Sequence, residues 1–347
     1  MKKIVSLVLI FPLIFCSCDT TDYSDIESKA IVSAIGIDNK EDKILLTMEI
    51  VKTDGAKEKG VEATVIETEG QNLYECLSGI SSKISKTLFY SHCAVIAFGE
   101  NLNPKVINNM LDFCFLDNEF TLLLKIVSTN NANQLLKATP KNQPIVGYEI
   151  MSILSSREKN LSIGYKNSYI NISRNKNEPP FLYALPFIKL EEQKSFSLKG
   201  VKLYENNLET VYFDEFDGTV YEILSNNFSS GQVVVKDEGS VILSSVLKSK
   251  TKLNCSFKNN KLKINVIVNQ NLDAHQTANL NVESYKKAIY NLSIKILKES
   301  FNKNIDLLGV LEHLKKFDNN IYKKIRKNFK SHYKNSEISF AVNIKEG

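Results

Sequence analysis

The amino-acid sequence predicts an α+β (mixed α/β) protein, with an N-terminal sheet-and-helix region followed by a C-terminal β-meander packed with helices. Two observations predict this class. Between residues 29 and 140, strand-like runs alternate with segments that have a helical period. Between residues 196 and 347, strand-like segments come first and helical segments follow. Both orders are typical of helices packed on a sheet, and the length allows two to three domains.

Residues 1–17 form a predicted secretory signal peptide. Two lysines precede an apolar run over residues 4–15, which is interrupted by Ser6 and Pro12. A membrane-spanning helix needs about 20 apolar residues. Because this run is shorter, we interpret it as a segment removed after export.

Cys18 is the predicted site of lipid attachment. Ser17 stands directly before Cys18 and fits a lipobox, in which a small residue precedes the lipidated cysteine. Bulky Phe15 directly before Cys16 fits this motif poorly. Phe15 is also the third residue before Cys18, a position where leucine is usual. Diacylglycerol and an N-acyl chain such as palmitate on Cys18 would hold the protein firmly, since each buried CH₂ contributes about 0.8 kcal/mol. Residues 18–28 then serve as lipid attachment and spacer. An ordinary cleaved signal and an uncleaved anchor are the alternatives.

Residues 29–190 are the predicted N-terminal domain. It opens with a hairpin, because the β-rich segments 29–38 and 43–51 flank turn residues, and an alternating strand follows at 61–68. Next we expect a helix at 72–84, a strand at 94–98 ended by Gly99, a helix opened by Pro104 with Ile107, Met110, Leu111 and Cys114 inward, a strand at 121–127 and a helix at 131–137.

The stretch 140–180 differs in composition, with frequent Pro, Asn, Ser and Lys. One helix is expected at 146–154, and the remainder is predicted to be a separate or mobile subregion. A strand at 184–190 would complete the domain, and Pro186 indicates an edge strand because proline cannot donate to a ladder. Residues 191–195 are the predicted domain boundary.

Residues 196–347 are the predicted C-terminal domain. Expected strands are 196–204, 209–213, 231–235, 241–249, 251–257 and 261–268, the last two joined by a turn at 258–260. Helices are expected at 214–225, 282–301, 306–316 and 320–329, before a closing strand at 337–344. This order predicts a sheet with helices on it.

Composition excludes several classes of protein. The net charge is +5, but charges of both signs are mixed, without the dense basic block of a nucleic-acid binder. No stretch after the signal peptide reaches the length of a membrane span. Cys76, Cys93 and Cys114 stand in apolar stretches and are predicted to be buried thiols, and Cys255 forms no C-x-x-C pair.

No catalytic or metal-binding motif rises above background, and we expect no enzyme activity, cofactor or metal site. His92 and Cys93 cannot share a site if they lie in a strand, because neighbours there point to opposite faces.

Residues 315–334 hold the densest positive charge. The structural interpretation is an exposed helix with Ile321, Ile325 and Phe329 inward. The functional interpretation is contact with anionic headgroups or an acidic partner.

A series of motifs resembles the C-subunit family of spore germinant receptors, the Ger(x)C or GerAC-like lipoproteins of endospore-forming bacteria. Each motif is weak alone, but their order and spacing over nearly all of the mature chain are specific. After the lipobox cysteine they are Asp25–Glu27, Ala34–Asp38, Tyr90–Glu100, Leu111–Phe113, Gly200–Tyr204 and Asp306–Gly309, followed by a basic helix and a closing strand.

The resemblance implies a mixed α/β fold of about three domains and a subunit without catalytic residues. It implies a receptor complex at the outer face of the spore inner membrane, with a multi-pass A subunit and a transporter-like B subunit as partners. Small nutrients would trigger the complex, and germination would follow. Cys18 is the one site residue that the resemblance transfers.

Two other functions are weighed against this one. A solute-binding lipoprotein of a nutrient importer would share the lipobox and the length, but it needs a ligand cleft between two similar lobes, and the halves here differ in element order. A surface hydrolase would share export alone and lacks the motifs of that chemistry.

Overall fold

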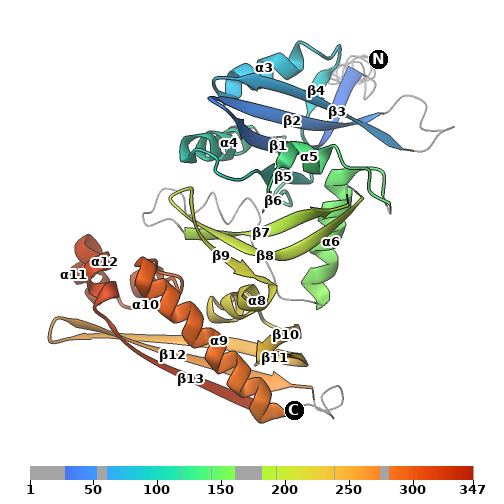
Figure 1. Cartoon of the computed structure of the whole chain (residues 1–347). Coiled ribbons are helices and arrows are strands. Elements are labelled where there is room, and N and C mark those ends of the chain that lie inside the picture. The colour runs from blue at the N-terminus through green and yellow to red at the C-terminus, as the bar shows by residue number, and fades with distance from the viewer. Residues whose placement is uncertain are drawn as a thin grey trace, which may run out of the picture.

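The computed structural model describes residues 28–52, 61–117, 119–141, 143–160, 182–192, 194–237, 239–273 and 281–346. The predicted signal peptide, Cys18 and nearly all of the spacer lie outside these ranges, as does most of the predicted separate subregion. A nine-stranded mixed sheet, sheet A, is followed along the chain by a four-stranded sheet, sheet B, and helices pack on both (Figure 1). The predicted fold class is confirmed.

The first strands of sheet A form an antiparallel meander of β1 (Lys29–Lys40), β2 (Lys43–Lys52) and β3 (Glu62–Gly70). Ile35 of β1 lies opposite Met48 of β2, and both are fully buried. The apolar runs that predicted the hairpin therefore form the centre of the sheet, and the hairpin and the third strand are confirmed.

The next part of sheet A is parallel. One edge of β1 pairs with the short strand β4 (Thr87–Phe89) and then with β5 (Val95–Phe98), and β5 pairs with β6 (Lys125–Ser128). The helices of this part are α3 (Leu73–Ser81), α4 (Pro104–Leu116), α5 (Ala132–Leu136) and α6 (Val146–Asn160). The predicted inward face of α4 is confirmed, because all four of its residues are buried.

The predicted strand at 121–127 is wrong over its first half. Thr121–Leu124 form a turn, and β6 begins at Lys125. The hydroxyl of Thr121 accepts a hydrogen bond from the Leu123 N–H at 2.9 Å, so a side chain takes the place of a strand partner. Apolar alternation therefore overstated the length of this strand.

Sheet A continues with the antiparallel strands β7 (Leu182–Glu191), β8 (Ser195–Glu205) and β9 (Leu208–Asp214). The prediction that Pro186 marks an edge strand is wrong, because β7 lies between β6 and β8. One register pair, Ser128 opposite Phe187, joins β6 to β7. The Pro186 carbonyl accepts from the Ser128 hydroxyl at 3.2 Å, so the proline faces this short seam, where few ladder bonds are needed.

The predicted boundary at 191–195 falls in the hairpin that joins β7 to β8. Both strands belong to sheet A, and so does β9. The chain leaves sheet A only at α8 (Glu215–Leu224). The division into two domains, 29–190 and 196–347, therefore stays a prediction.

Sheet B has the order β10 (Gly231–Asp237), β11 (Ser240–Lys258), β12 (Lys261–Leu272) and β13 (Glu337–Glu346), with β13 parallel to β12. The predicted separate strands at 241–249 and 251–257 are one strand, because no turn residue separates them and a register shift after Val246 absorbs the irregularity. Along this sheet lie α9 (Val282–Lys303), α10 (Val310–Phe317), α11 (Asn319–Ile325) and α12 (Phe329–Lys334).

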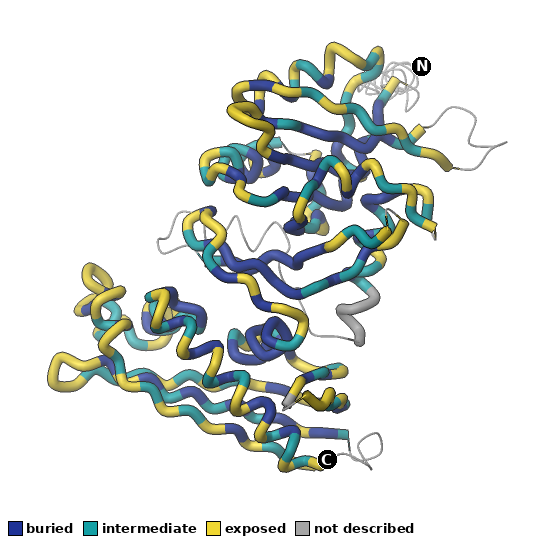
Figure 2. The backbone as a smooth tube through the Cα atoms, viewed as in Figure 1, coloured by how far each residue is buried: buried dark blue, intermediate teal, exposed yellow. Residues whose placement is uncertain are grey.

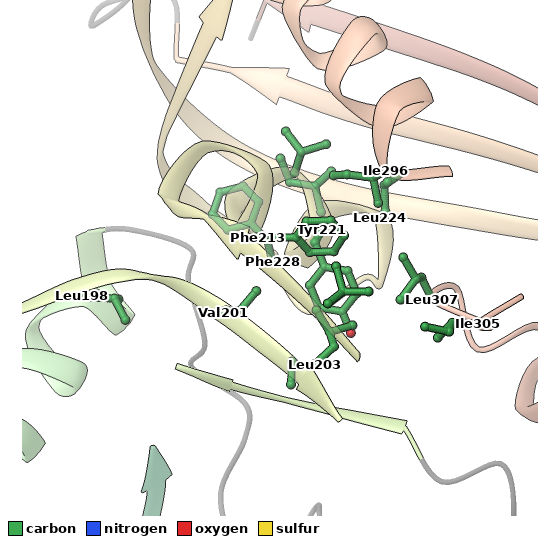
Figure 3. Packing of buried hydrophobic residues seen from close by; sticks show 14 of the residues in the cluster. Leu198, Val201, Leu203, Phe213, Tyr221, Leu224, Phe228, Ile296, Ile305 and Leu307 are labelled. Atoms are coloured by element: carbon green, nitrogen blue, oxygen red, sulfur yellow. The ribbon is translucent and has the colours of Figure 1, made fainter. Parts of the chain in front are cut away.

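Helix α8 joins the two sheets through one core. All eight residues from Asp217 to Leu224 are buried, and Figure 2 shows most of this helix in dark blue. A helix that is buried all round has neighbours on every side. Figure 3 shows Phe213 of β9 beside Tyr221, Leu203 of β8 below them, and Ile296 of α9 beside Leu224. Buried side chains of both sheets therefore belong to one continuous cluster.

Two buried carboxylates of the β1–β2 hairpin hold helix N-termini. Asp38 accepts from the backbone N–H groups of Ala132 and Asn133 at 2.8 and 2.7 Å, at the start of α5. Glu49 accepts from Val146 and Gly147 at 2.7 and 2.9 Å, at the start of α6. These amides have no partner inside the helix. Burial raises the pKa of both carboxyls, and the amide hydrogen bonds oppose that shift.

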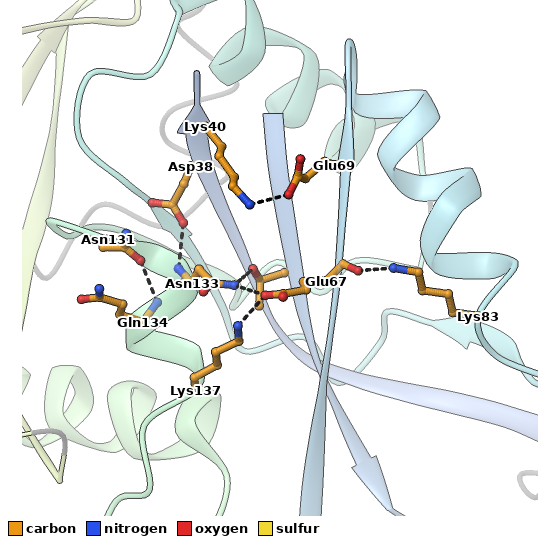
Figure 4. Close-up of polar contacts among 10 residues, drawn as sticks. Asp38, Lys40, Glu67, Glu69, Lys83, Asn131, Asn133, Gln134 and Lys137 are labelled. Atoms are coloured by element: carbon orange, nitrogen blue, oxygen red, sulfur yellow. Dashed lines mark hydrogen bonds and ion pairs between the residues drawn. The ribbon is translucent and has the colours of Figure 1, made fainter. Parts of the chain in front are cut away.

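Further polar contacts fix α5 against β2 and β3 (Figure 4). The Asn133 side chain donates to the Thr47 hydroxyl at 2.8 Å and to the Glu67 carboxylate at 2.6 Å. Lys137 pairs with the same carboxylate at 2.6 Å. The helix is therefore held at its first turn by Asp38 and along its length by Glu67.

We expect Gly99→Ala to destabilise the fold through Asp38. A Cβ atom at position 99 would stand 2.0 Å from Asp38 Oδ1, so the carboxylate must leave the α5 terminus. We expect the free energy of unfolding in urea to fall by about 2 kcal/mol.

Gly218→Ala in buried α8 is the matched control. Its Cβ would meet no atom closer than 3.5 Å, and alanine favours a helix by about 1 kcal/mol, so we expect no loss. Equal urea midpoints for the two variants would contradict the role of Asp38.

Candidate functional site

The structure brings three of the sequence motifs together at one end of sheet A. Residues 34–38 lie in β1, and residues 95–98 of the second motif form β5, with Ala34 opposite Val95 and Ile37 opposite Phe98. The third motif, residues 200–204, lies in β8. Gly99 and Glu100 follow β5 and reach toward β1 and β8 respectively.

Lys202 of β8 is the centre of this junction. Its ammonium lies 3.1 Å from the Glu100 carboxylate and 3.2 Å from the Glu209 carboxylate, and it stands 4.7 Å above the centroid of the Phe187 ring. The Lys202 side chain is 6% exposed, whereas the two carboxylates are about one-third exposed. Asn130 donates to Glu100 at 2.8 Å and orients it. A buried ammonium needs such partners, because desolvation without them is costly.

Gly200, in the same motif as Lys202, permits the close approach of β9. Its φ is +139°, a conformation that side chains disfavour, and a Cβ there would stand 2.0 Å from the Phe213 carbonyl. Two positions on from Lys202, the Tyr204 ring stacks on Tyr183 of β7 with centroids 5.3 Å apart. The motif is therefore explained by strand packing around the buried lysine.

Tyr90 and Phe113, from the motifs at 90–100 and 111–113, meet at the other end of the parallel strands. Their centroids lie 5.5 Å apart, edge to face, and Phe120 stacks on Tyr90 at 4.9 Å. The Glu119 carboxylate accepts from the Tyr90 backbone N–H at 3.0 Å. This aromatic trio fixes the loop that follows α4.

Asp306, from the last motif, caps α10. Its carboxylate accepts from the N–H groups of Val310 and Leu311 at 2.8 and 2.9 Å, and Gly309 takes the left-handed conformation, with φ +66°, that lets the chain enter the helix. Desolvation raises the pKa of Asp306 to about 6, against the opposing backbone hydrogen bonds. Asp38, Glu49 and Asp306 thus each accept backbone N–H groups at the start of a different helix.

Within the part of the chain that the structure describes, the histidine and cysteine side chains considered in the sequence are not gathered into one site. His92 is exposed and Cys93 is buried, in the turn before β5 rather than in the strand. Cys76, Cys93 and Cys114 are buried free thiols, as predicted, and Cys255 is half-buried. Desolvation raises the pKa of Cys76 to about 11 and of Cys255 to about 12. Among the described residues, no three His, Cys, Asp or Glu side chains gather to hold a metal ion.

The basic stretch 315–334 forms short helices rather than one. Ile325 and Phe329 are buried and Ile321 is half-buried, as the structural interpretation predicted. Lys330 pairs with Glu205 at 2.9 Å. Separately, no helix within the described ranges is long and apolar enough to cross a membrane.

We expect Lys202→Met to lower the free energy of unfolding by about 2 kcal/mol. The variant keeps the apolar stem but leaves two carboxylates facing each other without their cation. Lys199→Met on the same strand is the control, because Lys199 pairs with Glu191 at the surface, where such a pair contributes about 0–1 kcal/mol. Equal losses in urea unfolding would show that Lys202 is an ordinary surface lysine.

We expect the free energy of unfolding to depend on pH through Asp306, and Asp306→Asn to remove this dependence. A carboxyl with a folded pKa of about 6 binds its proton more tightly than in the unfolded chain, where the pKa is about 3.9. Its stabilising contribution is therefore full below about pH 4 and is lost as pH rises through 6. Between pH 7 and pH 5, the free energy of unfolding in urea should rise by about 1 kcal/mol more for the wild type than for the variant. A constant difference would contradict this.

Comparison with known proteins finds a family model that matches each half of the chain. Residues 22–190 match the family model described as the spore germination protein N-terminal domain, and residues 205–345 match spore germination B3/GerAC like, C-terminal. No curated protein matches the chain. A solved structure, the crystal structure of the GerBC protein, is similar at 14% identity with a TM-score of 0.56.

That likeness covers 90% of this chain and 96% of the GerBC chain, and at such low identity it shows a shared fold. The two family models, in contrast, rest on sequence, and together they cover nearly all of the chain after the predicted signal peptide and spacer. The chain therefore belongs to the GerAC-like family of spore germination proteins.

Proposed function

We propose that this chain is a lipoprotein subunit of a nutrient germinant receptor complex, required for nutrient-triggered spore germination. Family membership over both halves of the chain is the observation that carries the proposal. The subunit acts by protein–protein interaction at the membrane surface and catalyses no reaction. Its partners are a multi-pass A subunit and a transporter-like B subunit.

The proposed location is the outer face of the spore inner membrane, with the chain anchored through acyl chains on Cys18. Ser17 and the short apolar run before it support this anchor. Two acyl chains give a lasting attachment, whereas one gives reversible binding.

The roles of the motif residues support a scaffold rather than an enzyme or a solute-binding protein. Asp38, Gly99, Lys202 and Asp306 each contact backbone or paired charges inside the fold. A solute-binding lipoprotein would place its ligand between two similar lobes. Sheet A has nine strands of mixed direction and sheet B has four, so the two parts are not similar.

The test is co-purification of the tagged protein from detergent-solubilised spore membranes, with Cys18→Ala compared to wild type. We expect labelled palmitate and both multi-pass partners in the wild-type sample, and their loss or reduction in the variant. Cys255→Ala, at a half-buried thiol of sheet B, controls for the loss of a cysteine and should behave as wild type. Wild-type protein that is membrane-bound but recovered alone would overturn the receptor role.

A further inference from the structure

Four large apolar side chains are displayed around the loop that follows α4. Phe115 and Leu116 end the helix and are 63% and 74% exposed, and Leu122 and Leu123 in the turn before β6 are 63% and 73% exposed. We call these four residues the loop patch. Exposed apolar side chains gathered in this way mark a surface that contacts something other than water.

The loop is held in shape while the patch faces outward. Inside it, Phe120 packs on Tyr90 and Phe113. The backbone closes on itself, since Asp117 accepts from the Glu119 N–H at 2.9 Å and Thr121 accepts from the Leu123 N–H at 2.9 Å. The exposure of the patch is therefore built into the fold.

Each of the two acidic side chains between the patch residues, Asp117 and Glu119, accepts a backbone N–H, and Glu119 remains exposed. Asp117 Oδ1 bonds the Glu119 amide, and Glu119 Oε2 bonds the Tyr90 amide at 3.0 Å. Nearby, the Lys29 ammonium stands 4.1 Å above the Phe89 ring. Lys29 thus places a positive charge at this end of the sheet, which suits a headgroup layer.

The patch lies at the end of sheet A where the chain enters. β1, β5 and β6 are parallel, and α4 connects the end of β5 to the start of β6, so its C-terminus returns to the starting end of all three strands. Contacts trace the same route. Phe120 stacks on Tyr90, which follows Phe89, and Phe89 pairs with Ile31 near the start of β1.

The length of chain before β1 limits how far this end can be from a lipid on Cys18. Ten residues lie between Cys18 and Lys29. A fully extended chain spans at most about 3.6 Å per residue, so the eleven steps from Cys18 to Lys29 reach at most about 40 Å. A lipid tether at Cys18, which is part of the proposed function, therefore keeps the entry end of sheet A within about 40 Å of the bilayer and free to touch it.

We propose that Phe115, Leu116, Leu122 and Leu123 insert into the boundary between headgroups and acyl chains of the membrane that holds Cys18. The tether keeps the protein at the bilayer, and the patch sets which end of sheet A faces it. This inference rests on the proposed lipid anchor but adds a second, non-covalent membrane contact. Apolar side chains at such depth gain from leaving water, as interfacial helices do.

The test uses the absence of tryptophan from the sequence, which makes any introduced tryptophan a unique fluorophore. Leu123→Trp is placed in the full lipidated chain and reconstituted in phosphatidylcholine–phosphatidylglycerol vesicles, with or without brominated acyl chains. Tyr290→Trp, at an exposed position on α9, is the matched control. Both sites are exposed, so neither variant disturbs a core.

We expect both variants to float with the vesicles. Emission of Leu123→Trp should shift to the blue and fall at least two-fold in brominated lipid, and emission of Tyr290→Trp should change in neither respect. Floating protein with equal emission from the two lipids would overturn the inference.

Failure to float would instead contradict the lipid anchor. In that case, a histidine tag in place of residues 1–18 holds the same variants on nickel-chelating lipid, and the emission still decides. Quenching of Leu123→Trp there supports insertion of the patch, and its absence overturns it.

Discussion

The burial of α8 on all sides is the constraint on which the rest of the structure depends. Eight consecutive residues of this helix are buried, and three of them, Asp217, Thr219 and Glu222, are polar. Such a helix cannot remain folded on one sheet alone, because its opposite side would face water. Lys295 of α9, a helix that packs on sheet B, pairs with the buried Asp217 of α8. The two matched family regions therefore meet at a shared core and form one body.

Local patterns in the sequence predicted most elements, and interactions between distant segments explain the errors. The paired asparagines 206–207 and 259–260 take positive φ, which is why the short hairpins were predicted correctly. The turn at 121–124 depends instead on a side-chain hydrogen bond, and the continuity of β11 depends on β12. Pro186 was misplaced because β6 pairs with β7 at one residue, a property of two strands that neither shows alone.

The candidate site, like the fold, was only partly predictable from the sequence. The motifs were visible in the sequence, but Glu100 and Lys202 stand 102 positions apart and their pairing is a product of the fold. The roles of Asp38 and Asp306 as caps also depend on helices that lie elsewhere in space or begin after a turn. One signal was overlooked. Phe115 and Leu116 fall outside the inward face of α4, and that departure alone marks them as candidates for exposure.

The single register pair between β6 and β7 has a mechanical consequence. A ladder of backbone hydrogen bonds resists sliding along its whole length, and sheet A has such ladders on both sides of this seam but not across it. Side chains bridge the gap instead, through Ser128 and Pro186 and through Glu100 and Lys202. Ionic contacts yield to small displacements and to salt more readily than a ladder does. Within the described part of sheet A, the seam between β6 and β7 is therefore more compliant than the strand pairs on either side of it.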